Sequence, residues 1–375
     1  MKINPNIMLF AENSIEINAR LWFPLRRRNG LVSISEDGEN IDVRWIPIPG
    51  LDMFKEAMFT DILNIDNKLI LVPHACEKIG IYDVEMKTFS FLPTPQSMYR
   101  GFVYDKYAFM VGWEYPGIVK IDIKNGSMEC FDIWTDCSGD IGYIPKKHHG
   151  PYFSEGLIYE KYGNVLLPVG NACGLLRFNV YNGKKDFLYL DGFFDCVSGI
   201  ALCGDKIFVS GSGKNSCYFL ILDKQGNIID KLCVLEKSEN YALGYSCLKY
   251  HRGILYAFPS VGGKFKMVDV REMRVIPLEK YNGLFEVDDS KLQMGIKFGN
   301  VKITENIIKF IAGDTLLWHS VNMDTGDDET KSYIDTNLNS IDFFCNAAKS
   351  YGSRGIQMNE SILNLESYLE WVCTF

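Results

Sequence analysis

The chain contains 375 residues, with 39 Lys and Arg against 47 Asp and Glu, and it carries a formal net charge of −8. Hydrophobic residues make up 47% and charged residues 23%, which is typical of a folded protein and too apolar for a disordered one. The acidic balance argues against non-specific binding of nucleic acid, which requires an excess of Lys and Arg.

Length and cysteine usage set the expected class and location of the protein. Single hydrophobic cores stop growing at roughly 250–300 residues, so we expect either two domains or a ring of repeats. No apolar run approaches the ~20 residues of a membrane span, and residues 1–10 lack the features of a signal peptide. Eleven cysteines without a C-x-x-C spacing are typical of buried thiols in a reducing compartment. We therefore expect a cytoplasmic protein with no membrane partner.

One unit recurs along the chain. It consists of an apolar strand that ends in Pro, Gly or a small residue, a short polar loop, and a second apolar strand that ends near Asp or Asn. Three clear copies place these strands at 68–73 and 79–84, 164–168 and 175–180, and 254–259 and 265–270. We call the residue that ends the first strand the marker residue; the seven are Pro24, Pro73, Gly112, Pro168, Gly211, Pro259 and Ala312. They lie on average 48 residues apart.

Each unit has room for four short strands. In the copy at 68–84, for example, a further strand is expected at 61–65 and another at 87–92, and turn dipeptides such as Asn125-Gly126 separate strands elsewhere. Four-stranded units repeated four to eight times predict a β-propeller, in which each blade is covered by its neighbours. We expect an all-β, seven-bladed β-propeller over residues 1–335, with six blades if a terminal unit is misassigned. The marker residues are then expected to end the second strand of each blade.

The pattern resembles that of kelch-like propellers. These also carry a marker at the end of the second strand and a third strand of the form hydrophobic-Tyr-Asp, as in Ile81-Tyr82-Asp83. The resemblance covers roughly residues 5–335 and implies a propeller fold. The glycine pairs and spaced Trp of kelch repeats are mostly missing, so the resemblance implies no functional residue.

Two segments depart from the repeat. Residues 281–300 form a longer insertion, which we expect to be a polar loop over one face. Residues 336–375 follow the last unit, and Asn359 can cap a short α-helix at about 360–372. The apolar stripe of this helix is predicted to dock on the propeller or to bind a partner, and it comprises Ile362, Leu365, Leu369 and Val372.

The topology of a propeller predicts where a site would form. Loops that follow the marker residues, and connections from the fourth strand to the next blade, emerge on one face around the channel mouth; we call this face the rim. The segments there are rich in cations and aromatic rings, which suit a polar, anionic or glycosidic ligand. The ligand-binding candidates are Arg26, Arg27, Arg28, Lys78, Arg100, Trp113, Tyr115, Tyr152, Asn171 and Tyr245.

Acid–base chemistry at the same rim would use two carboxylates and two imidazoles. Glu77 and Glu114 are the rim carboxylates best placed for this work, and His74 and His149 could act as general bases. Glycoside hydrolysis needs two carboxyl groups about 5–10 Å apart. A three-histidine metal site would need His74 together with the pair at 148–149, and we predict no metal site and no cofactor.

Three classes of function remain open. The first is a non-catalytic propeller whose rim binds a protein, a peptide or a glycan, because no catalytic signature is present and the fold hosts unrelated functions. The second is a carbohydrate-active lyase or hydrolase with its active site at the same rim. The third is a metal-dependent enzyme that uses the histidines. Whether the protein is an enzyme is left open by the sequence.

Overall fold

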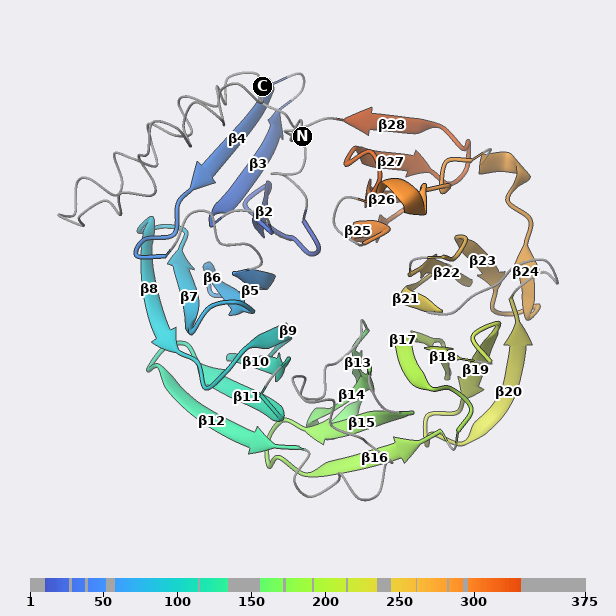
Figure 1. Ribbon diagram of the computed structural model, residues 1–375, viewed down its shortest axis with the longest axis horizontal. Coiled ribbons are helices and arrows are strands. Elements are labelled where there is room, and N and C mark those ends of the chain that lie inside the picture. The colour runs from blue at the N-terminus through green and yellow to red at the C-terminus, as the bar shows by residue number, and fades with distance from the viewer. Residues whose placement is uncertain are drawn as a thin grey trace.

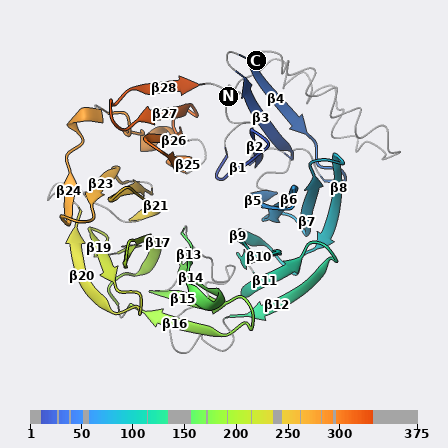
Figure 2. The same ribbon diagram turned by 180° about the vertical axis from the view of Figure 1, so that it is seen from behind.

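The protein is a ring of seven four-stranded antiparallel sheets around one axis (Figures 1 and 2). This computed structural model confirms the predicted seven-bladed, all-β propeller. The structure describes residues 11–26, 29–37, 40–51, 58–113, 115–133, 156–170, 173–190, 192–213, 215–234, 244–260, 262–281, 283–292 and 296–331. The predicted C-terminal extension at 336–375, with its helix, lies outside these ranges.

Each sheet, or blade, is built from four consecutive strands, the first nearest the axis and the fourth at the periphery (Figure 1). Blades 1 to 3 comprise β1 (Ile15–Ile17), β2 (Arg20–Pro24), β3 (Leu31–Asp37) and β4 (Asn40–Ile46); β5 (Phe59–Ile65), β6 (Lys68–Pro73), β7 (Lys78–Asp83) and β8 (Thr88–Pro93); and β9 (Met98–Tyr104), β10 (Tyr107–Gly112), β11 (Gly117–Asp122) and β12 (Ser127–Asp132). Blades 4 and 5 comprise β13 (Ile158–Tyr159), β14 (Asn164–Val169), β15 (Gly174–Asn179) and β16 (Lys185–Tyr189); and β17 (Cys196–Cys203), β18 (Lys206–Ser212), β19 (Tyr218–Leu222) and β20 (Ile228–Cys233). Blades 6 and 7 comprise β21 (Tyr245–His251), β22 (Ile254–Pro259), β23 (Lys266–Asp269) and β24 (Arg274–Ile276); and β25 (Phe298–Thr304), β26 (Ile307–Ala312), β27 (Trp318–Asn322) and β28 (Asp328–Lys331).

The marker residues lie where the repeat predicted them. Pro24, Pro73 and Gly112 are the last residues of the second strands of blades 1 to 3, and the markers of the other blades lie at or one residue before the same point. Proline cannot donate a backbone hydrogen bond, so a strand end is a position that tolerates it. The loops that follow the marker residues therefore begin at the same end of the second strand in every blade, and so on the same face of the ring.

The core is a series of apolar layers between neighbouring blades. In β6, the side chains from Leu69 to Val72 are all fully buried, whereas β20 at the periphery is mostly exposed. A strand covered on both faces reads as a continuous apolar run, which explains the sequence of the second strands. Each blade therefore depends on both neighbours for the burial of its faces.

The ring closes by packing between blade 1 and blade 7. The ring centroids of Phe23 in β2 and Trp318 in β27 are 5.9 Å apart, and Leu25, Ile311 and Leu316 bury their side chains in the same cluster. In the described chain, each sheet is formed entirely by strands that are consecutive in sequence, so no strand is shared between the first and last blades. Closure therefore depends on side-chain packing and not on a strand ladder between the two blades.

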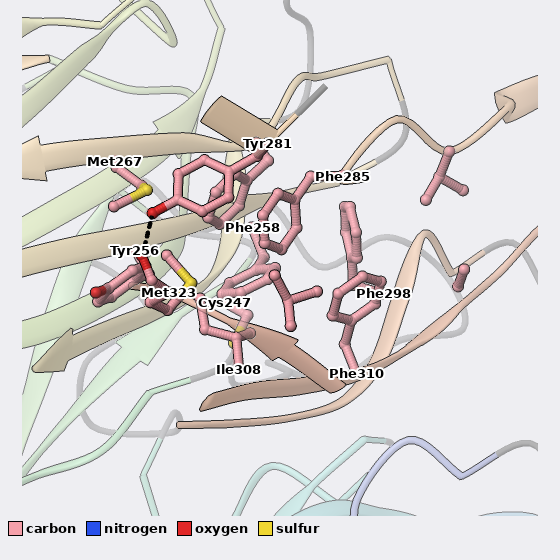
Figure 3. Packing of buried hydrophobic residues seen from close by; sticks show 14 residues of the cluster. Cys247, Tyr256, Phe258, Met267, Tyr281, Phe285, Phe298, Ile308, Phe310 and Met323 are labelled. Carbon is pink, nitrogen blue, oxygen red and sulfur yellow. Dashed lines mark hydrogen bonds between the residues drawn. The ribbon is translucent and has the colours of Figure 1, made fainter. Parts of the chain in front are cut away.

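The insertion after blade 6 differs from the expected polar loop. It contains two 3₁₀ turns, Glu279–Tyr281 and Asp289–Lys291, and it buries Phe285 against blades 6 and 7 (Figure 3). The Phe285 ring stacks on that of Phe265 at a centroid distance of 4.0 Å, and the Tyr281 hydroxyl donates a hydrogen bond of 2.9 Å to the Met323 carbonyl. The expectation was wrong because this segment contributes aromatic rings to the layer between the two blades.

The closure of the ring can be tested with Trp318→Ala. Removing a buried indole leaves a cavity between blades 1 and 7, and we expect a loss of about 3–5 kcal/mol in the free energy of unfolding, measured by urea titration. The control is Tyr189→Ala in β16, whose ring is exposed and whose loss should cost about 0.5 kcal/mol or less. Equal costs for the two variants would show that the contact between the terminal blades does not stabilise the ring.

Candidate functional site

The rim is assembled as the topology predicted, because loops after the second strands meet the connections that lead into the same blades. In blade 3, the Trp113 amide donates a hydrogen bond of 3.0 Å to the Ser97 carbonyl. The corresponding bond in blade 5, from the Asp195 amide to the Ser212 carbonyl, is 2.9 Å long. These bonds hold the loops after the second strands and the connections that lead into the blades together on one face of the ring.

Three aromatic side chains from blades 2 and 3 gather at this rim; we call them the aromatic cluster. The His74 and Trp113 ring centroids are 5.3 Å apart in an edge-on arrangement, and those of Tyr99 and Trp113 are 5.1 Å apart. The guanidinium carbon of Arg100 lies 4.8 Å from the Tyr99 ring centroid, within the range of a cation–π contact. All four side chains are partly exposed. The structure thus brings together three of the predicted site residues with Tyr99.

A β-bulge orients Tyr99. Where β9 pairs with β10, Arg100 lies opposite Val111 but Met98 lies opposite Gly112, so Tyr99 is the extra residue. A bulge changes the direction of the side chain that it carries and is frequent beside functional sites. The Thr60 hydroxyl of blade 2 donates a hydrogen bond of 2.7 Å to the Tyr99 carbonyl and so holds the bulge in place.

Glu12 pairs with two of the predicted arginines. One carboxylate oxygen forms an ion pair with Arg26, and the other lies 3.4 Å from a guanidinium nitrogen of Arg100. The Glu12 side chain is only 6% exposed, so these charges interact with little screening by water. Both arginines are therefore committed in part to an internal carboxylate, which reduces their capacity to bind an external anion.

Asp61 is a second carboxylate beneath the rim, and it is fully buried. Its oxygens accept hydrogen bonds from the backbone amides of Ile62 and Gly101, both 2.9 Å, and from the Asn13 side chain at 3.1 Å. Burial raises the pKa of Asp61, although the charge of Arg100 and the hydrogen bonds act in the opposite direction. Asp61 thereby links blade 2 to blade 3 and to the segment that precedes blade 1.

This preceding segment, Glu12 to Ser14, also reaches blade 7. The Asn300 amide of β25 donates a hydrogen bond of 2.9 Å to the Glu12 carbonyl, and the Ser14 hydroxyl donates one of 2.6 Å to the Asn300 side chain. We call residues 12–14 the N-terminal clamp. Sequence reasoning missed it because it precedes the first repeat, whereas Asp61 could have been noticed as a charged residue inside an apolar strand.

Three predicted residues lie farther out on blades 2 and 3. Glu77 and Lys78 are exposed at the start of β7, and the Lys78 ammonium lies 5.9 Å from the Phe91 ring centroid. Tyr115 lies beside Cys130 of the outermost strand, and burial raises the pKa of its phenol. These side chains are placed toward the periphery and not in the aromatic cluster.

Tyr245 has a different environment from the one expected. Its side chain is fully buried, with its ring centroid 5.2 Å from that of Phe219, and its backbone amide donates a hydrogen bond of 2.8 Å to the Ser210 hydroxyl. The structure therefore places Tyr245 in the core of blades 5 and 6. The remaining candidates lie outside the described residues: Arg27, Arg28, Glu114, His149, Tyr152 and Asn171.

Two cavities lie apart from the aromatic cluster. One, of about 1,010 Å³, is bounded by blade 6, the end of β20 and the insertion, and Lys264 contributes to its wall. The other, of about 670 Å³, is lined by the inner strands of blades 4 to 7. Within the described ranges, no three His, Cys, Asp or Glu side chains are grouped as a metal ion would require. None of the helices in these ranges has the length and apolar character needed to cross a bilayer.

Comparison with known proteins supports the fold alone. No protein-family model matches the chain, and no curated protein matches it. Among solved structures, YCF48 bound to the D1 peptide is 9% identical, with a TM-score of 0.55 over 81% of this chain and 90% of that one. The dihydro-heme d1 dehydrogenase NirN is 10% identical, with a TM-score of 0.52 over 69% of this chain and 54% of that one. The extracellular domain of a hybrid two component system from B. thetaiotaomicron is 13% identical, with a TM-score of 0.56 over 81% and 39%.

The role of Glu12 can be tested with Glu12→Gln. Removing its charge leaves the guanidinium groups of Arg26 and Arg100, whose side chains are 29% and 13% exposed, without the buried carboxylate that both contact, and we expect a loss of about 3 kcal/mol in the free energy of unfolding. Asp42→Asn serves as a matched control, because this carboxylate also contacts two arginines but is 46% exposed, and it should cost about 1 kcal/mol or less. If urea titrations gave similar losses of unfolding free energy for the two variants, the claim that the buried Glu12 carboxylate stabilises the fold would be contradicted.

The raised pKa of Asp61 predicts a pH effect on stability. The folded state binds the Asp61 proton at a higher pH than the unfolded chain, whose carboxyl titrates near 3.8. This group therefore lowers the free energy of unfolding as the pH rises from about 4 to the raised pKa. We expect the stability of Asp61→Asn, relative to the unaltered protein, to increase over that window. Parallel pH profiles in urea titrations would show that Asp61 titrates alike in both states.

Proposed function

We propose that the protein is a propeller binding module that takes a peptide segment of a partner protein at the aromatic cluster. The observation that carries this proposal is the convergence of His74, Tyr99 and Trp113 with Arg100 from two blades, at a position where all four remain partly exposed. Trp, Tyr and Arg are the residue types that dominate binding energy at protein interfaces. Their rings offer large contact areas with few rotatable bonds.

The electrostatics of the rim favour a peptide over a free anion. Arg26 and Arg100 both contact Glu12, so an incoming carboxylate or phosphate would compete with an internal one. Aromatic faces bind side chains by stacking and apolar contact and do not need a net charge on the ligand. A peptide is also the ligand in the similar propeller structure of YCF48 bound to the D1 peptide, which supports the proposal by analogy of fold.

The proposal can be tested by selecting peptides from a random phage-displayed library on the immobilised protein and measuring their Kd by fluorescence anisotropy. We expect Trp113→Ala to weaken the selected peptides at least tenfold, because each large aromatic anchor of an interface contributes about 2 kcal/mol or more. Tyr99→Ala should have a similar effect. The control is Tyr189→Ala, which removes an exposed ring on the outer strand β16 and should leave the affinity unchanged.

Thermal unfolding of each variant separates binding from folding. Tyr99 and Trp113 are only partly buried, so the variants should remain folded at the temperature of the binding assay. Peptides that bind Trp113→Ala and the unaltered protein equally would refute the assignment of the site. A library that yields no peptide, together with glycan binding that is lost in Trp113→Ala, would favour a carbohydrate ligand instead.

A further inference from the structure

The smaller cavity lies at the end of the channel opposite the rim. Inner strands start at the rim and end at the hairpins that lead to the second strands, and the walls of this cavity are the final parts of four inner strands. They come from β13, β17, β21 and β25, so blades 4 to 7 each contribute one segment. The volume of about 670 Å³ falls within the range of small-molecule sites, which is roughly 300–1,000 Å³.

The lining combines apolar surface with cations. Tyr159, Leu202 and Tyr250 line the cavity and are between 36% and 52% exposed, so they offer apolar surface to a ligand. Lys249 and Lys302 lie in the same lining, on neighbouring inner strands. A few charged groups among aromatic and aliphatic ones is the usual composition of a ligand site.

The two lysines make the lining of the cavity cationic. Lys302 is half-buried, and burial together with the charges of Lys309 and Lys249 lowers its pKa, while Glu16 acts in the opposite direction. The described residues that line the cavity include Lys249 and Lys302 and no Asp or Glu, in a chain whose formal net charge is −8. Two ammonium groups at the wall of one cavity create a positive potential that attracts an anion.

We infer that this cavity binds a small ligand that carries a carboxylate or phosphate group attached to an aromatic or apolar portion. The anionic group contacts Lys249 and Lys302, and the apolar portion covers the exposed faces of Tyr159, Leu202 and Tyr250. This site is independent of the rim, since it shares no residue with the aromatic cluster and uses different blades. Its occupancy therefore does not depend on whether the rim binds a peptide.

The inference can be tested by isothermal titration calorimetry with phenyl phosphate, benzoate and the neutral analogue benzyl alcohol. We expect at least one of the two anions to bind, and benzyl alcohol to bind at least tenfold more weakly. The binding should weaken as the salt concentration rises. The variant carrying both Lys249→Met and Lys302→Met should raise the Kd of the anion at least tenfold, because methionine keeps most of the side-chain volume and removes the charge.

Lys224→Met is the matched control, because it removes one charge from an exposed turn of blade 5 and should leave the Kd unchanged. Lys249→Met alone removes an exposed charge and provides the same comparison should the double variant not fold. The inference is overturned if neither anion binds at millimolar concentration, if benzyl alcohol binds as tightly as the anions, or if the lysine variants bind them like the control.

Discussion

The contact on which the rest of the structure depends is the one between the first and last blades. A four-stranded sheet of this composition has two apolar faces, so each blade needs a neighbour on both sides, and only a closed ring supplies one to every blade. Phe23 and Trp318 supply the apolar part of the closing contact. Because each sheet in the described chain is continuous in sequence, no strand ladder joins the two blades, and side-chain packing carries most of the contact.

The N-terminal clamp supplies the polar part of that contact and also builds the site. Residues 12–14 bond to Asn300 of blade 7, and through Glu12 and Asn13 they reach Arg100 and Asp61 of blades 3 and 2. The aromatic cluster therefore rests on charged groups that also hold the ring closed. Arg100 contacts both Glu12 and Tyr99, so under the proposed function a change in the position of Arg100 affects both peptide binding and the stability of the closed ring.

The blade count and the position of the rim could be predicted from sequence because they depend on spacing alone. The environment of individual rim residues could not be predicted from sequence, and Tyr99 and Tyr245 show the reason. Both occur near the start of an inner strand, but Tyr99 is the extra residue of its bulge, whereas Tyr245 precedes the extra residue of its own, Ser246. Tyr245 therefore corresponds to Met98, and both are fully buried. A shift of one residue reverses the face of the sheet on which a side chain lies, and the strand propensities of the residues do not reveal such a shift.

The two ends of the channel differ in the charged side chains that surround them. At the rim, Glu12 and Asp61 lie among arginines of blades 1 and 3, so positive and negative groups compensate one another within the protein. At the opposite end, Lys249 and Lys302 lie 53 residues apart in sequence and are brought together by the packing of blades 6 and 7, and the described lining of the cavity there contains no Asp or Glu. The inner strands of all blades surround the axis, so charged side chains at their ends lie near one another and their electrostatic potentials add. This difference is the basis of the two proposals: a peptide bound through aromatic rings at the rim and an anion bound at the opposite end.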